Sequence, residues 1–158
     1  MAFFRFVFDK RAGALIYVLK TSIFAFTLVA AVISVAIALD LAKPYDTQIA
    51  SVPQEVFGAL VIAPLFENIC FILIAEFFLA LRLGWTTVIL IVASLSAVGH
   101  GIVADWRAVA GFVMFAVMTY SYLLWSEKPF GRRYLLTVAQ HTLLNAPFAS
   151  ALVISVLD

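Results

Sequence analysis

Residues 21–39 read TSIFAFTLVAAVISVAIAL, a run without a single charged side chain. About 20 apolar residues in a helix cross the hydrocarbon core of a bilayer, so this run has spanning length. It is also longer than the roughly 7–15 apolar residues of a secretion signal, although basic residues precede it. We therefore expect a retained transmembrane helix from Thr21 to Leu39.

The composition extends this expectation to the whole chain. Hydrophobic residues make up 65% of the sequence and charged residues 12%, with a mean hydropathy of +1.12. Soluble proteins are roughly 45–50% apolar and about 25% charged. Four more apolar blocks follow, at about 56–81, 85–104, 108–125 and 134–157. They are too long for barrel strands of about 10 residues. The sequence predicts an all-α transmembrane bundle of about five spans, forming a single domain over residues 1–158.

The residues before the first span mix aromatic and charged side chains. Residues 3–11 read FFRFVFDKR, which is typical of an interfacial segment with rings among the lipid headgroups. A frayed terminus is an equally valid alternative. A short tight turn is expected at Leu83 and Gly84, and further connections at residues 105–107 and 127–133.

Lysine and arginine residues predict the orientation, because cytoplasmic loops are enriched in them. With the N-terminus inside, eight of them fall on the cytoplasmic side: Arg5, Lys10, Arg11, Lys20, Arg82, Lys128, Arg132 and Arg133. Lys43 and Arg107 fall on the opposite, outer side of the membrane. We expect an integral protein of the cell membrane with a cytoplasmic N-terminus. Lipids are its expected surroundings, and the net charge of +1 gives no reason to expect a nucleic-acid partner.

Polar residues inside the apolar blocks are the candidate functional residues. They are Glu67, His100, His141 and Asn145. Placing a charged side chain at the bilayer centre costs at least about 2.5–3.5 kcal/mol. Such residues therefore face the bundle interior and usually have a functional role. His141 and Asn145 share a helix face because they are four residues apart. Taken alone, each of these residues is more often an interhelical hydrogen bond than a functional group.

Several neighbours of these four residues also carry expectations. Gly99 and Gly101 flank His100 and leave room for a cavity or for a close helix contact. Glu76 lies half a turn away from Glu67 around the helix and near Arg82, which indicates a structural or interfacial acid. Cys70 lies in an apolar run, and a single cysteine excludes a disulfide within the chain.

The four polar residues suit hydrolysis. A glutamate beside a histidine can take a proton from water and create a nucleophile. Histidine and asparagine side chains can donate hydrogen bonds to the oxyanion that forms on an attacked carbonyl. Glu67, His100 and His141 could instead hold a divalent metal such as zinc, although no H-E-x-x-H motif is present.

Three stretches resemble motifs of one family. They are Ala63-Pro64-Leu65-Phe66-Glu67-Asn68, Ser94 to His100, and His141-Thr142-Leu143-Leu144-Asn145. In order and in their placement on successive spans they look like the CPBP family, the CAAX-prenyl proteases and bacteriocin-processing proteins of the Abi group. The resemblance covers about residues 63–147. It implies an intramembrane protease with no required cofactor, in which Glu67 and His100 activate water, while His141 and Asn145 form the oxyanion hole.

The chain departs from the family pattern at three positions. Asn68 stands where a second glutamate is usual, Ile72 where an arginine is usual, and Ser96 where a phenylalanine is usual. Two alternatives to a hydrolase acting on a peptide or protein substrate therefore stay open. One is a catalytically inactive immunity, scaffold or partner-stabilising protein, which would have a membrane-protein partner. The other is a proton or ion pathway, because intramembrane Glu and His residues often relay protons.

Overall fold

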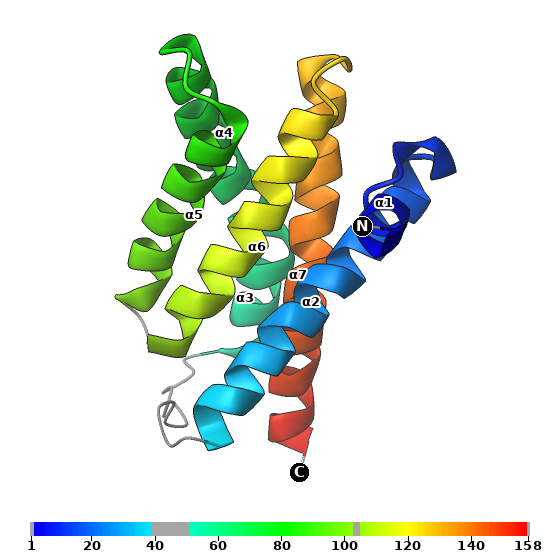
Figure 1. The fold of residues 1–158 in the computed structure, drawn as a ribbon. Coiled ribbons are helices and arrows are strands. Elements are labelled where there is room, and N and C mark those ends of the chain that lie inside the picture. The colour runs from blue at the N-terminus through cyan, green and yellow to red at the C-terminus, as the bar shows by residue number, and fades with distance from the viewer. Residues whose placement is uncertain (1, 39–50, 103–104, 158) are drawn as a thin grey trace.

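The protein is a bundle of helices, seen in a computed structural model that describes residues 2–38, 51–102 and 105–157 (Figure 1). No strand occurs among these residues, so the predicted all-α class is confirmed. The elements are α1 (Ala2–Val7), the 3-10 turn η1 (Lys10–Ala12), α2 (Ala14–Ala38), α3 (Val52–Phe57), the π-helical turn η2 (Gly58–Ile62), α4 (Ala63–Ala80), α5 (Trp85–Gly101), α6 (Asp105–Leu124) and α7 (Phe130–Leu157).

Three helical stretches are long and apolar enough to cross a membrane: Ala14–Val35, Val52–Ala80 and Arg107–Leu124. Trp85–Gly101 is apolar but shorter. The prediction of about five spans is therefore supported for three or four helices of the described chain. α5, at 17 residues, is shorter than the roughly 20 that a straight span needs. α7 carries two arginines in its first turn and several polar residues in its middle, which lower its hydropathy.

Two helices extend past the charged residues expected to end them. α2 begins at Ala14, ahead of the predicted start at Thr21, and runs through Lys20. The Lys20 ammonium lies 3.9 Å from the centre of the Phe6 ring and donates to the Phe6 carbonyl, so α1 accommodates this charge. Residues 105–107, predicted to connect two spans, instead form the first turn of α6.

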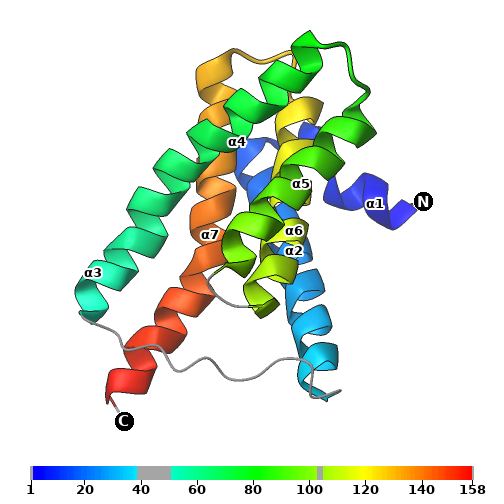
Figure 2. The same ribbon diagram turned by 90° about the vertical axis from the view of Figure 1, so that its left-hand side faces the viewer.

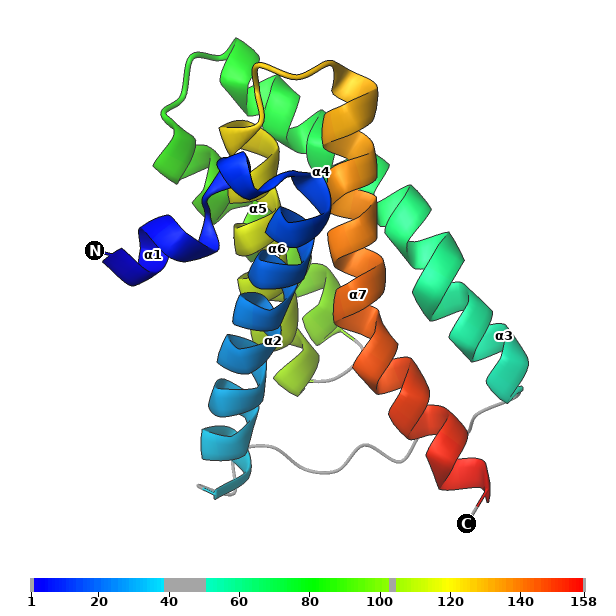
Figure 3. The same cartoon turned by 90° about the vertical axis from the view of Figure 1, so that its right-hand side faces the viewer.

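α6 and α7 lie at the centre of the bundle. α6 packs against α5 and α2, while α7 packs against α2, α6 and α4. Figure 2 shows the continuous rod α3–η2–α4 crossing α7 obliquely, with α5 and α6 beside it. Figure 3 shows that α1 lies near the end of the bundle that also holds the α4–α5 and α6–α7 connections. Apolar side chains of α2, α4, α5, α6 and α7 form the main core between these helices.

Proline causes the π-helical turn that precedes α4. Pro64 has no N–H, so it cannot donate to the carbonyl of Leu60. The N–H of Ala63 donates to Gly58, which removes the donor that Ala59 would have in a regular helix. α7 supplies both missing donors, because Thr142 Oγ1 donates to Leu60 (3.1 Å) and Asn145 Nδ2 donates to Ala59 (2.8 Å).

Two polar clusters, one buried and one partly exposed, tie the helices together away from Glu67. In the first, Gln140 Nε2 donates to Thr21 Oγ1 (2.6 Å) and Ser121 Oγ (2.9 Å), and Tyr17 donates to the same serine (3.0 Å). These side chains join α2, α6 and α7. Gln140, adjacent to His141 in sequence, therefore points away from it into the bundle, because successive side chains on a helix diverge by about 100°.

Glu76 belongs to the second cluster, near the α6–α7 connection. It accepts hydrogen bonds from Tyr122 of α6 and from Arg133 of α7, the latter at 3.2 Å. The guanidinium of Arg133 also lies over the Tyr122 ring, 4.3 Å from its centre. The expected structural role of Glu76 is confirmed, although its partner is Arg133 rather than the neighbouring Arg82.

Candidate functional site

Three of the four predicted site residues meet at one point. Glu67 Oε2 lies 3.7 Å from His100 Nε2 and 3.7 Å from His141 Nε2. The three residues come from α4, α5 and α7, and only the tertiary fold brings them together. Glu67 and His100 are part-exposed, with side-chain exposures of 41% and 32%, whereas the His141 side chain is 2% exposed.

The backbone of α5 fixes the tautomer of His100. Its Nδ1 lies 2.8 Å from the carbonyl oxygen of Ser96, one turn earlier. A carbonyl can only accept, so Nδ1 carries the proton and a neutral ring presents the Nε2 lone pair toward Glu67. A base for water needs such a lone pair.

Asn68 fixes the other histidine in the opposite tautomer. Its Nδ2 donates to the Pro64 carbonyl and lies 3.0 Å from His141 Nδ1. The Pro64 carbonyl settles which end of the amide is the NH2 group, so His141 Nδ1 accepts the second amide hydrogen. A neutral His141 therefore carries its proton on Nε2, facing Glu67. The departure from the family pattern at position 68 is thus a fully buried residue with a defined hydrogen-bonding position.

Aromatic and glycine residues of α6 support the two imidazoles. The ring of Phe115 lies with its centre 5.6 Å from that of His100 and 5.4 Å from that of His141. Gly111 lies directly against His100, and a Cβ built there would be 3.1 Å from His100 Cγ. Sequence reasoning missed Gly111 and the position of Asn68. The expectation for Gly99 and Gly101 is confirmed: a Cβ at Gly101 would meet Ala108 at 3.0 Å, and Gly99 lines a cavity, with nothing within 4 Å of a Cβ built there.

A cavity of about 940 Å³ opens beside Glu67 and His100. Its walls are mostly apolar, which fits the pocket size and character that proteins use for small ligands. Among the residues that line it are Glu55, Ala59, Phe66, Glu67, Cys70, Phe71, Leu95, His100, Gly111, Met114, Phe115, Asn145 and Phe148. Cys70 is exposed on this wall.

His141 and Asn145, which the resemblance assigns to one oxyanion hole, lie in different positions relative to the cavity. His141 is buried behind Glu67 and is not among the lining residues of the cavity, so its Nε2–H is placed to face the carboxylate rather than a ligand. Asn145 lines the cavity, but one N–H of its amide donates to the carbonyl of Ala59. Its second N–H is the amide donor that a bound carbonyl could use.

The tautomers also bear on the metal alternative. A nitrogen that carries a proton cannot bind a metal ion, so His141 Nε2 does not suit zinc while Asn68 donates to Nδ1. Within the described ranges, no group of three or more His, Cys, Asp or Glu side chains is arranged to hold a metal ion. With these tautomers, Glu67, His100 and His141 do not together supply three metal-binding atoms.

Comparisons of the chain with protein-family models, curated proteins and solved structures give no match. The resemblance to the CPBP family accordingly rests on the motif residues and on nothing else.

Proposed function

We propose that the chain is an intramembrane endopeptidase of the CPBP type, which hydrolyses a peptide bond near or within the membrane. The observation that supports this most is the placement of the Glu67 carboxylate beside the unprotonated Nε2 of His100 (3.7 Å), at the wall of a large apolar cavity. Two adjacent proton acceptors that face an apolar pocket can activate a water molecule to attack an apolar substrate bound there.

The reaction would use the two oxygens of Glu67 differently. Oε2 has an accessible area below 1 Å² and no hydrogen-bond partner among the described residues, and it faces the two imidazoles. The other oxygen and His100 Nε2 are then the pair that holds a water. One of these groups takes a proton as the water oxygen bonds to the substrate carbonyl carbon. The same proton passes to the leaving amine as the C–N bond breaks.

His141 and Asn145 assist this reaction from two sides. The Nε2–H of His141 points to the buried oxygen of Glu67 and stabilises the carboxylate form. The free N–H of Asn145 donates to the oxyanion on the substrate. In this arrangement the oxyanion donor is Asn145, and His141 acts through Glu67. Neither step requires a cofactor, and zinc is the alternative that a chelator test addresses.

The orientation proposed for the chain is a cytoplasmic N-terminus in the cell membrane. The described cations of α1, η1, the α4–α5 connection and the α6–α7 connection lie toward the same end of the bundle (Figures 1 and 3). A cluster of Lys and Arg at one end is what the positive-inside rule associates with the cytoplasm.

Heavy-oxygen labelling tests the hydrolase directly even while the substrate is unidentified. Purified protein in phosphatidylcholine vesicles is incubated in heavy-oxygen water with a library of peptides that each contain an apolar segment. Hydrolysis places one heavy oxygen in each new C-terminal carboxylate, which mass spectrometry detects. We expect Glu67→Gln and His100→Ala to lower cleavage by about 10²–10⁴-fold, the usual contribution of a general base.

Glu55→Gln is the matched control, because Glu55 lines the same cavity and loses the same charge. It should cleave as the parent does. Equal cleavage by the parent, Glu67→Gln and His100→Ala would refute the proposal. Loss of cleavage by the parent on adding a chelator, with recovery on adding zinc, would favour the metal alternative.

A catalytically inactive immunity, scaffold or partner-stabilising protein is the second candidate. The observation that favours it is the commitment of Asn145 to Ala59 and of Asn68 to Pro64, which gives these amides a structural use. It predicts that a cellular phenotype of the gene survives Glu67→Gln with expression unchanged. The proton-pathway alternative predicts instead a liposome proton flux that Glu67→Gln abolishes.

A further inference from the structure

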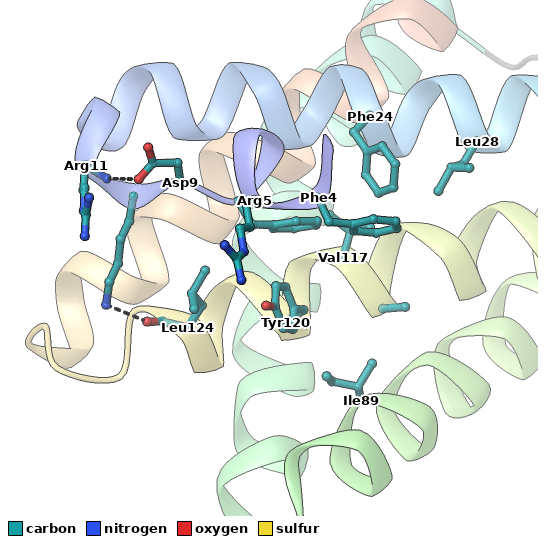
Figure 4. Close-up of a pocket in the computed structure, with 13 residues that line it drawn as sticks. Phe4, Arg5, Asp9, Arg11, Phe24, Leu28, Ile89, Val117, Tyr120 and Leu124 are labelled. Carbon is teal, nitrogen blue, oxygen red and sulfur yellow. Dashed lines mark hydrogen bonds between the residues drawn. The ribbon is translucent and has the colours of Figure 1, made fainter. Parts of the chain in front are cut away.

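A second cavity, of about 1,020 Å³, lies on another side of α6, between α1, α2 and α5 (Figure 4). It shares no lining residue with the cavity at Glu67. The cavity is as large as typical ligand pockets, which are about 300–1,000 Å³. Along α6 it extends from Leu124 to Ala116, a length of about 12 Å at 1.5 Å per residue.

The two ends of this cavity differ in polarity. Figure 4 shows Arg11 and Asp9 at one end, near Leu124, with Arg5 close to Tyr120. Phe24 and Leu28 of α2, Val117 of α6 and Ile89 of α5 line the other end. The cavity therefore changes from charged to apolar along α6, from the end of the helix toward its middle.

Two guanidinium groups are available at the charged end. The nearby Lys10 already has partners, since its ammonium donates to the Glu127 carboxylate (2.9 Å) and to the Leu124 carbonyl (3.3 Å). Asp9 accepts from the backbone N–H of Arg11 (3.0 Å). The side chains of Arg5 and Arg11 have no ion-pair or hydrogen-bond partner within the part of the chain that the structure describes. Arginine's planar group is well suited to phosphate.

We propose that this cavity binds one anionic phospholipid, with the phosphate at Arg5 and Arg11 and an acyl chain along the apolar walls of α2, α5 and α6. Basic pockets between transmembrane helices, on the side where cations gather, recognise anionic headgroups. A soluble phosphate compound would leave the apolar end unfilled. A zwitterionic lipid would fill it but would gain less from the two arginines. The proposal is independent of the hydrolase activity.

Lipid binding can be counted on the full-length protein by native mass spectrometry after delipidation in detergent. Phosphatidylglycerol, phosphatidylcholine and glycerol phosphate are the three probes. We expect phosphatidylglycerol to bind more tightly than phosphatidylcholine by about tenfold or more, from two cations each worth about fivefold near an anionic headgroup. The preference should weaken as salt concentration rises, because the headgroup contact is electrostatic.

Variants separate the two ends of the cavity. Arg5→Gln with Arg11→Gln should abolish the preference for phosphatidylglycerol, while Arg5→Lys with Arg11→Lys should keep most of it. The matched control, Arg82→Gln with Arg132→Gln, removes one exposed arginine of the α4–α5 connection and one of the first turn of α7, and it should change nothing. Ala116→Trp, which fills the cavity, should weaken binding of both lipids.

Three results would overturn the proposal. One is equal binding of the two lipids by the parent at low salt, which requires no variant to fold. Another is a preference that survives in the Arg5 and Arg11 glutamine variant. The third is binding of glycerol phosphate as tight as that of phosphatidylglycerol, which would mean a phosphate site without a place for the acyl chain.

Discussion

Replacing Gly111 by alanine should disturb His100 without removing any polar group of the site. The new Cβ would lie 3.1 Å from His100 Cγ, 3.2 Å from its Nδ1 and 3.3 Å from its Cβ. Optimal separations between carbon atoms begin near 3.5 Å, so the ring and the α6 backbone must move apart by about 0.4 Å. The ring is held by Ser96 and by Phe115, so it cannot yield freely.

Both the stability and the rate should change by a measurable amount. Overpacking of this kind costs about 1–3 kcal/mol, offset by the roughly 0.5–1 kcal/mol that alanine gains over glycine in a helix. A displacement of about 1 Å in a catalytic group can cost about 100-fold in rate, so a shift of about 0.4 Å should cost several-fold.

Gly99→Ala is the matched control, since it is the same substitution next to His100 with no atom within 4 Å of the new Cβ. We expect it to be slightly more stable than the parent and to lose less activity than Gly111→Ala does, because its methyl group enters the open cavity without touching His100. Denaturant unfolding in micelles gives the free energy of unfolding, and the heavy-oxygen assay gives the rate. If Gly111→Ala matched Gly99→Ala in both measurements, the close contact beneath His100 would be refuted.

Three further predictions concern hydrogen bonds that the fold creates. Asn68→Asp keeps the side-chain shape but removes the N–H donor to His141, so it should invert the His141 tautomer and slow cleavage by roughly tenfold. Asn145→Ala leaves a carbonyl of the π-helical turn without its donor, so it should lower the free energy of unfolding by about 1–3 kcal/mol. The Lys10 hydrogen bond holds the pKa of the Glu127 carboxyl below its ordinary value, so packing of η1 against the α6–α7 connection should weaken as the pH falls through that lowered pKa.

Each of these has a distinct measurement and a distinct contrary result. Cleavage unchanged in Asn68→Asp would show that the amide donor is not needed. For Asn145→Ala the measurement is denaturant unfolding, and unchanged stability would leave only the oxyanion role. For the ion pair, the protection of the α1 and η1 amides against hydrogen exchange, taken relative to the intrinsic exchange rate at each pH, should fall at low pH and stay constant in Glu127→Gln. The stabilisation is present above the ordinary carboxyl pKa, so protection that falls at high pH instead would contradict it.

Apolar length predicts most of the helices, but it does not predict their ends. Charges indicate boundaries, yet Lys20 lies inside α2 because the Phe6 ring and carbonyl receive its ammonium. Pro64 predicts a weak point in the helix. The π-helical turn that it produces depends on Thr142 and Asn145 of α7, which supply the missing donors. Such long-range contacts leave no local pattern in the sequence.

The members of the site can be predicted from the sequence, and their separate roles cannot. An intramembrane carboxylate and imidazoles are costly unless they face the bundle interior, so Glu67, His100 and His141 can be selected from the sequence. In the sequence, Asn68 is only a departure from a family motif, whereas in the structure its amide donates a hydrogen bond to His141. Gly111 carries no sequence signal, because a glycine in an apolar helix has many uses.

The amino-acid sequence by itself determined that the chain forms helices long and apolar enough to cross a membrane, because its uncharged blocks have spanning length, and it singled out the few polar residues inside those blocks. The packing of α4, α5 and α7 decided that His100 and His141 both face Glu67, and it decided the tautomer of His141. A tautomer depends on the partner of the opposite ring nitrogen. For His100 that partner is the Ser96 carbonyl, one turn earlier in the same helix, whereas for His141 it is the Asn68 amide of α4, which lies at hydrogen-bond distance only in the folded chain.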